Sequence, residues 1–129
     1  MEIRDDLRYT EEHEWVRLDG QSIVVGITDY AQEQLGEIVY VELPEESTAL
    51  SVGDTFGVVE STKSVSDLFS PIDGEVTRVN EDLLDAPEYV NTDPYGDGWM
   101  IRVQPEGDSD EIFESLLSPD EYRKLVGAE

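Results

Sequence analysis

The segment Glu60-Ser61-Thr62-Lys63-Ser64-Val65 connects two runs, residues 55–60 and 65–70, whose β-branched and aromatic side chains favour strands. Its small polar residues predict a tight turn, so that the two strands form a hairpin with Lys63 at the tip. Lys63 is one of only two lysines in the chain, and a primary amine on an exposed turn is accessible to an enzyme that acylates it. The alternative interpretation is an ordinary solvated lysine.

The position of the turn also predicts the register of this hairpin. If residues 61–64 form the turn, Val58 lies opposite Asp67 and Phe56 lies opposite Phe69. An aromatic pair of this kind would face the core. The polar residues at the turn would then remain in solvent.

Outside the hairpin, the pattern predicts mostly short strands and a few helices. Runs rich in β-branched and aromatic residues, bounded by turn residues, indicate strands at 14–18, 22–27, 38–43, 75–80 and 99–103. N-cap and proline signals indicate helices at 30–35, 110–117 and 119–126. A chain of 129 residues is the size of one domain, so we expect a single domain over 1–129, with a core at about 13–104 and a helical segment at about 108–127.

Charge is the most unusual feature of the composition. The chain has 32 acidic and 8 basic side chains, which gives a formal net charge of -24. Such a field repels phosphate backbones and anionic lipid surfaces, so binding to nucleic acid or to a membrane surface is not expected. An acid-rich, lysine-poor surface with ordinary hydrophobic content predicts a halophilic source, because concentrated salt screens the self-repulsion.

Further exclusions come from residue types and from apolar stretches. Cysteine is absent, which excludes disulfides, thiolate zinc sites and a cysteine nucleophile. The longest apolar runs, such as residues 23–25, are far shorter than the roughly 20 residues that cross a bilayer. The first residues also lack the apolar centre of a signal peptide, so we expect a cytoplasmic protein.

Several blocks of the sequence resemble the glycine cleavage H-protein family. The first is the lysine region, residues 60–67, followed by Ser70-Pro71-Ile72-Asp73-Gly74-Glu75-Val76. The others occur in the same order as in that family: His13-Glu14-Trp15-Val16, residues 25–32, residues 35–39, Val41-Glu42-Leu43-Pro44 and residues 94–100. The resemblance therefore extends over almost the whole chain.

The resemblance implies a mainly β fold, the barrel-sandwich hybrid of biotinyl and lipoyl carriers. This fold has two antiparallel sheets, here with a short internal helix and helices at the carboxyl end. It also implies that lipoate is attached to the side-chain nitrogen of Lys63 in amide linkage. The chain itself would be a non-catalytic carrier subunit, and its lipoyl arm would supply the sulfur that the composition lacks.

Partners follow from the same resemblance. A pyridoxal-phosphate-dependent glycine decarboxylase would load an aminomethyl group onto the arm, and a tetrahydrofolate-dependent aminomethyltransferase would remove it. Dihydrolipoyl dehydrogenase would reoxidise the arm, and a lipoate-attaching enzyme would modify the chain, which we expect to be a monomer. Two other carrier roles stay open: an H-like protein that relays lipoate between enzymes, and a carrier domain for another complex.

The resemblance further implies that Glu14 and Asp67 contact the amine of the loaded arm in a sheltering cleft. Two positions depart from the family, because Gln34 stands where many members have His and Glu12 where a small hydroxyl residue is common. His13 next to an aromatic strand residue is expected to be structural, although an enzyme that uses His13, Glu14 and Asp67 in acid–base chemistry is an alternative. No metal is expected, since the spacing of the aspartates after residue 92 does not fit a calcium loop.

Overall fold

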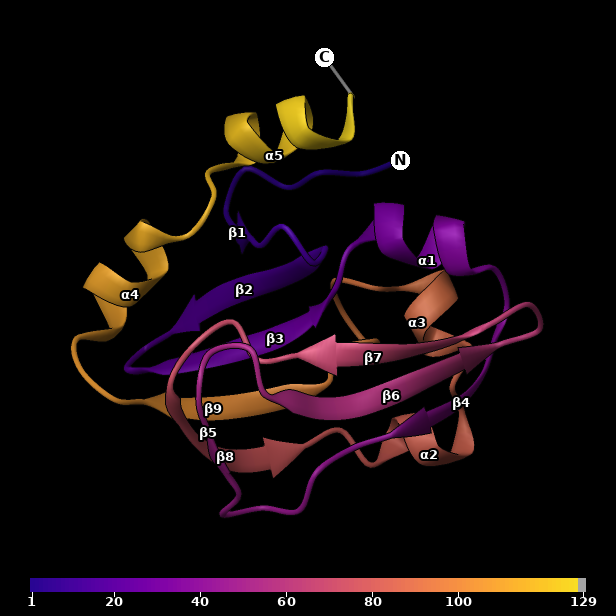
Figure 1. Ribbon diagram of the computed structural model, residues 1–129, viewed down its shortest axis with the longest axis horizontal. Coiled ribbons are helices and arrows are strands. Elements are labelled where there is room, and N and C mark those ends of the chain that lie inside the picture. Colours follow the sequence, from indigo (N-terminus) through magenta and orange to yellow (C-terminus); the bar gives the residue numbers. More distant parts are fainter. Residues whose placement is uncertain (128–129) are drawn as a thin grey trace.

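Two antiparallel sheets lie in separate layers of the computed structural model, which describes residues 1–127 (Figure 1). The last two residues of the predicted domain lie outside the described part of the chain. The larger sheet has the order β1 (Arg8–Tyr9), β2 (Glu14–Asp19), β3 (Ser22–Ile27), β9 (Ile101–Pro105), β8 (Gly74–Val79), β5 (Ala49–Leu50). The smaller sheet has the order β4 (Ile38–Glu42), β6 (Thr55–Ser61), β7 (Val65–Phe69).

The main core lies between these sheets, because each sheet turns one apolar face inward. Val41 and Val59 are partners on β4 and β6, and both side chains are buried. Val25 and Ile101 are partners on β3 and β9, and both are fully buried. Successive side chains of a strand point to opposite faces of the sheet. A slip by one residue would turn these core residues to the other face, so burial fixes the register.

In the described part of the chain, five short helices connect and cover the sheets: α1 (Asp29–Leu35), α2 (Asp82–Asp85), α3 (Tyr89–Thr92), α4 (Ser109–Ser115) and α5 (Pro119–Val126). Thr28 caps α1, and Ser118 forms a capping box with Glu121 at the start of α5. A second apolar cluster joins α5 to the amino-terminal strand, where the rings of Tyr9 and Tyr122 stack with centroids 4.5 Å apart. The amino-terminal segment and α5 therefore lie side by side (Figure 1).

The β6–β7 hairpin forms as predicted, with Val58 opposite Asp67. The predicted pairing of Phe56 with Phe69 is wrong, because the register shifts between Thr55 and Gly57 and leaves Phe56 in a bulge. The shift places glycine at a close approach to β4, where a Cβ at Gly57 would collide with the carbonyl oxygen of Glu42. Phe56 is buried in the core without a cross-strand partner on β7.

Other differences concern the shortest elements. The strand predicted at residues 99–103 lies at residues 101–105, because residues 94–99 form a turn and loop that cover the larger sheet. The two-residue strands β1 and β5 and the single-turn helices α2 and α3 were not predicted. Within residues 1–127, none of the helices has the length and apolar content that a membrane span requires.

Candidate functional site

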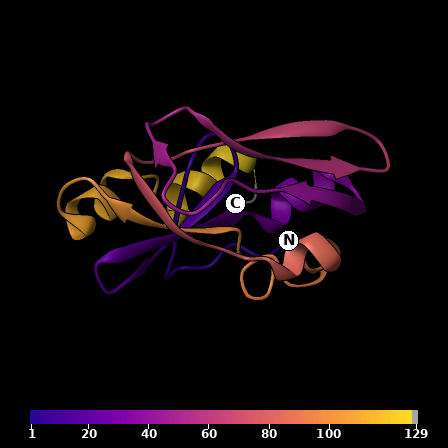
Figure 2. The same cartoon turned by 90° about the horizontal axis from the view of Figure 1, so that it is seen from below.

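Lys63 lies at the tip of the β6–β7 hairpin, which projects past the rest of the molecule (Figure 2). The turn is held by Ser61, whose N–H donates to the carbonyl of Ser64 at 2.8 Å. The hydroxyl oxygen of Ser61 accepts from the N–H groups of Lys63 and Ser64 at 3.1 and 3.0 Å. A small hydroxyl residue thus satisfies the turn backbone and leaves the lysine side chain exposed.

The segment that follows α1 supports the tip of the hairpin. The N–H of Thr62 donates to the carbonyl of Glu37 at 3.1 Å, which ties the turn to the residues that follow α1. Asn91 on α3 fixes this segment in turn, because its side chain accepts from the N–H of Ile38 and donates to the carbonyl of Gly36. Sequence patterns gave no signal for this role of Asn91, whose partners are more than 50 residues away.

Gly36 ends α1 with φ 84° and ψ -158°, a backbone region that is almost restricted to glycine. A Cβ here would also lie 2.9 Å from Cε of Lys63, so the lysine stem runs directly over the glycine. The absence of a side chain at Gly36 therefore gives the lysine stem room beside the end of α1.

We expect Gly36→Ala to reduce the free energy of unfolding by about 1–3 kcal/mol, because the backbone there is strained for any residue with a Cβ. The lysine end is flexible and can swing into solvent, so its displacement should add little. Urea denaturation of Gly36→Ala in the wild-type and Lys63→Ala backgrounds checks this. A cost that disappears in the Lys63→Ala background would show that the side-chain collision dominates.

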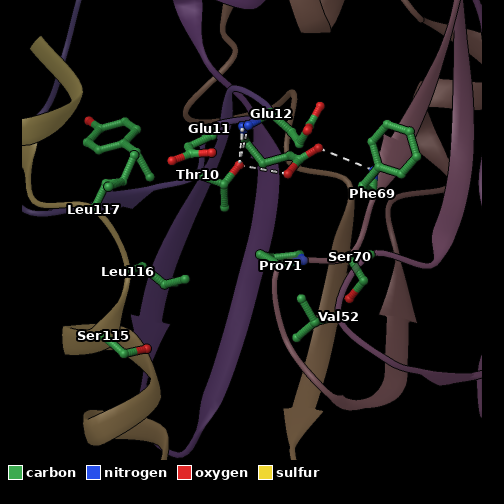
Figure 3. Close-up of a pocket in the computed structure, with 13 residues that line it drawn as sticks. Thr10, Glu11, Glu12, Val52, Phe69, Ser70, Pro71, Ser115, Leu116 and Leu117 are labelled. Atoms are coloured by element: carbon green, nitrogen blue, oxygen red, sulfur yellow. Dashed lines mark hydrogen bonds between the residues drawn. The ribbon is translucent and has the colours of Figure 1, made fainter. Parts of the chain in front are cut away.

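A groove of about 500 Å³ opens beside the other end of the hairpin (Figure 3). Its walls come from the segment after β1, the turn between β5 and β6, the end of β7 and the chain between α4 and α5. They include Thr10, Glu11, Glu12, Glu14, Val52, Phe69, Pro71 and Leu116. The lining is mixed, with aromatic and aliphatic groups alongside three glutamates. The sequence predicted a cleft near Glu14 but not the contribution of residues 115–117.

Glu14 is the buried acid of this groove, with 2% of its surface exposed. One carboxylate oxygen accepts from the hydroxyl of Thr10 at 2.8 Å, and the other accepts from the N–H of Phe69 at 3.2 Å (Figure 3). Burial raises the pKa of Glu14 from 4.5 to about 7, although both hydrogen bonds act in the opposite direction. A carboxyl group in this setting can take up and release a proton near neutral pH.

The three predicted site residues are not gathered at one point: two lie on the β6–β7 hairpin, and Glu14 lies on β2 beside its far end. Lys63 is at the tip, Asp67 is exposed on β7, and Glu14 contacts β7 at Phe69. In residues 1–127, no hydrogen bond or ion pair connects any two of the three, and Asp67 is absent from the groove lining. Val65 and Phe69 are four residue steps apart on extended β7, a distance of about 13 Å.

Three other residues singled out from the sequence have clear positions. His13 packs on the ring of Tyr30, and its Nδ1 lies 3.0 Å from the hydroxyl of Tyr122. Burial lowers the pKa of His13, and the contacts are those of a structural residue. Glu12 lines the groove, whereas Gln34 is exposed on α1. In the described residues, no group of three or more His, Asp or Glu side chains could hold a metal ion.

A lysine displayed on a projecting hairpin of a two-sheet β fold defines the class of carrier proteins that present an attached group to enzymes. The family model for Glycine cleavage H-protein matches residues 7–129. The chain belongs to this family, whose members are the lipoyl carriers of the glycine cleavage system.

Individual relatives agree with this assignment. The chain is 56% identical to the glycine cleavage system H protein of Anaeromyxobacter sp. (strain K), covering 98% of this chain and 97% of the relative. It is 54% identical to the probable glycine cleavage system H protein of Haloarcula marismortui, covering 97% of each. The crystal structure of a glycine cleavage system H protein from Mycobacterium marinum matches with a TM-score of 0.87 and 41% identity, covering 97% of this chain and 99% of that one. The expected fold class is thereby confirmed.

Proposed function

We propose that this chain carries lipoate in amide linkage on Lys63. The observation that carries the proposal is the geometry of the tip: an exposed primary amine, held out on a turn and supported from below by Gly36 and the Thr62–Glu37 hydrogen bond. The site fits the group, because the lysine stem already runs over a glycine and the amine has no carboxylate within 4.0 Å in residues 1–127. When bound, lipoate supplies a disulfide that can be reduced and can accept a one-carbon unit.

The chain's own contribution is tethering. A flexible arm on a projecting hairpin holds its reactive end at an effective concentration on the order of millimolar near a docked active site. In this role the chain would have four partner enzymes: a pyridoxal-phosphate-dependent glycine decarboxylase, a tetrahydrofolate-dependent aminomethyltransferase, dihydrolipoyl dehydrogenase and a lipoate-attaching enzyme. A single tip that must enter several active sites also favours a monomeric, non-catalytic carrier made of one domain.

Glu14 and Asp67 are the proposed contacts for the amine of the loaded arm. An arm that folds back from Lys63 must cover at least the length of β7, about 13 Å, to reach the level of Phe69, whose N–H donates to Glu14. It would pass Asp67 on the way and end beside a carboxylate that is shielded from water. Such shelter is useful because an exposed aminomethyl group is lost to hydrolysis.

The amino-acid composition supports a proposal about the source and location of the protein. The excess of 32 acids over 8 bases favours a halophilic source, in which the cytoplasm itself is salty. We therefore infer a cytoplasmic protein from such an organism.

The test is the intact mass of the protein purified from its native host, followed by peptide mapping. We expect the added mass of one lipoyl group on the peptide that contains Lys63 and none on Lys124, the other lysine. The lipoylated protein should then support exchange of bicarbonate with glycine in the presence of glycine decarboxylase. Unmodified protein from the native host would overturn the proposal, and lipoylated protein inactive in the exchange would favour a lipoate relay.

A further inference from the structure

Three of the chain's eight basic residues form a row across the larger sheet. Arg17 on β2 lies opposite Val24 on β3, Val24 lies opposite Arg102 on β9, and Arg102 lies opposite Arg78 on β8. Directly opposite residues of an antiparallel sheet project from the same face, so all three arginines share the face that points away from the main core. In a chain of net charge -24, this concentration of cations needs an explanation.

The three arginines line a cavity of about 220 Å³, together with Val24 and Trp99. The guanidinium carbon of Arg78 lies 6.0 Å from the ring centre of Trp99, and that of Arg17 lies 5.6 Å from the ring centre of Trp15. Stacking on indole rings fixes the directions of two guanidinium groups at low conformational cost. The cavity is smaller than the roughly 300–1,000 Å³ of pockets that enclose drug-sized ligands, so it suits one small group.

The charges of this cavity are only partly compensated by the protein. Arg102 pairs with Asp19 at 2.5 Å. Within residues 1–127, neither Arg17 nor Arg78 has a carboxylate within 4.0 Å, even though the chain has 32 acids. Arg17 donates only a long hydrogen bond, 3.5 Å, to the carbonyl of Tyr95. Arg78 and Trp99 also line a neighbouring cavity, whose walls include the acids Glu46, Glu81 and Asp82.

The arrangement also carries an electrostatic cost. Arg78 and Arg102 are direct cross-strand partners, and like charges in that position destabilise a sheet. An anion between them would relieve this repulsion, and guanidinium groups bind the oxygens of phosphate, sulfate and carboxylate through paired N–H donors. Three convergent guanidinium groups favour an anion with several oxygens and more than one negative charge.

We propose that the cavity formed by Arg17, Arg78, Arg102 and Trp99 is a binding site for a tetrahedral oxyanion, phosphate or sulfate, either free or as the phosphate of a mononucleotide. The indole of Trp99 offers an aromatic surface at the edge of the cavity, against which a nucleobase could stack. The site lies on a different sheet from the Lys63 hairpin and does not depend on the carrier role.

The test is a titration of the full-length protein with inorganic phosphate, replacing sodium chloride at constant ionic strength, followed by NMR of the indole N–H groups. We expect the Trp99 signal to shift in a saturable way, while that of fully buried Trp15 moves much less. Arg78→Gln and Arg17→Gln should each weaken phosphate binding about tenfold or more, because each removes charged donors. Circular dichroism and the dispersion of the NMR spectrum report whether each variant is folded.

Arg4→Gln is the matched control, because it removes the same charge at an exposed arginine whose partner is Asp6. It should leave the phosphate affinity within about twofold, as screening of a remote charge predicts. A parallel titration with adenosine monophosphate separates the two sources: tighter binding than phosphate identifies a mononucleotide, and equal binding identifies the free oxyanion. The absence of saturation in the wild-type protein, or an equal loss in Arg4→Gln and Arg78→Gln, would overturn the site.

Discussion

Replacing Lys63 by arginine is expected to abolish the attachment of lipoate while leaving the fold intact. Amide formation requires a deprotonated primary amine, and a guanidinium group stays protonated at any usable pH. The side chain at position 63 is exposed at a turn, so a substitution that keeps the charge should change the free energy of unfolding by no more than about 0.5 kcal/mol. The stem of arginine can also run over Gly36 as that of lysine does.

The measurement is the intact mass of Lys63→Arg after co-expression with a lipoate-attaching enzyme and a supply of lipoate. The control is Lys124→Arg, which changes the other lysine, located in the last turn of α5. We expect full modification of the control and none of Lys63→Arg. Lipoylation of Lys63→Arg would mean that the arm is attached elsewhere, and the carrier site proposed here would then be wrong.

The position of Lys63 could be predicted from sequence because the signals are local. A polar segment between two apolar runs indicates a hairpin wherever the rest of the chain lies, and the exposed turn confirms that expectation. The same holds for the start of α5, where Ser118 before a proline predicts a cap and the structure shows a capping box. Each of these features depends on a few neighbouring residues.

Features that depend on tertiary pairing escaped prediction. The strand β5 consists of two residues that are extended because they pair with Gly74 and Glu75 on β8. The bulge at Phe56 arises because β6 must pair with β4 as well as β7, and the close contact with Glu42 selects glycine at the next position. A hairpin considered by itself contains neither constraint.

The groove and the arginine row show the same limit for sites. Glu14 was placed at the cleft through the family resemblance, but its burial and its bond to Phe69 follow only from the arrangement of β2 against β7. The three arginines are far apart in sequence, and only the registers of four strands bring them into one row. Composition alone indicated an acid-rich surface and did not locate the arginines on it.

Glu14→Gln is expected to stabilise the protein at neutral and alkaline pH. Glu14 has a pKa of about 7 in the folded protein, against 4.5 in an ordinary environment, so folded protein keeps a proton that unfolded protein has lost between these two pH values. Because of Glu14, the free energy of unfolding of the wild type is highest below pH 4.5 and falls as the pH rises to about 7. Above pH 7 the contribution of Glu14 stays constant. Glutamine has no such titration.

The size of the effect follows from the shift. A rise in the pKa of Glu14 from 4.5 to about 7 corresponds to about 3 kcal/mol of unfolding free energy. Glu14→Gln should gain this full amount above pH 7 and none of it below pH 4.5. Glutamine can keep both contacts, since its oxygen can accept from the N–H of Phe69 and its amide can donate to the hydroxyl of Thr10. Urea denaturation at pH 4.5 and pH 8 measures the difference from wild type. Glu11→Gln, which removes the same charge at an exposed acid of the groove, is the control and should change the free energy of unfolding by no more than about 0.5 kcal/mol.

The ammonium group of the loaded arm would explain why the chain keeps Glu14, an acid that destabilises the fold at neutral pH. A cation beside Glu14 supplies the missing opposite charge, which lowers the pKa of the carboxyl group and recovers part of the burial cost. Glu14→Gln should therefore release the aminomethyl group from the loaded arm to water faster than wild type, even though the variant itself is more stable at pH 8. A variant that is more stable and equally protective would leave Glu14 without a role in holding the arm. If Glu14 holds the arm, Glu14→Gln must raise the free energy of unfolding and at the same time lower the protection of the aminomethyl group from water.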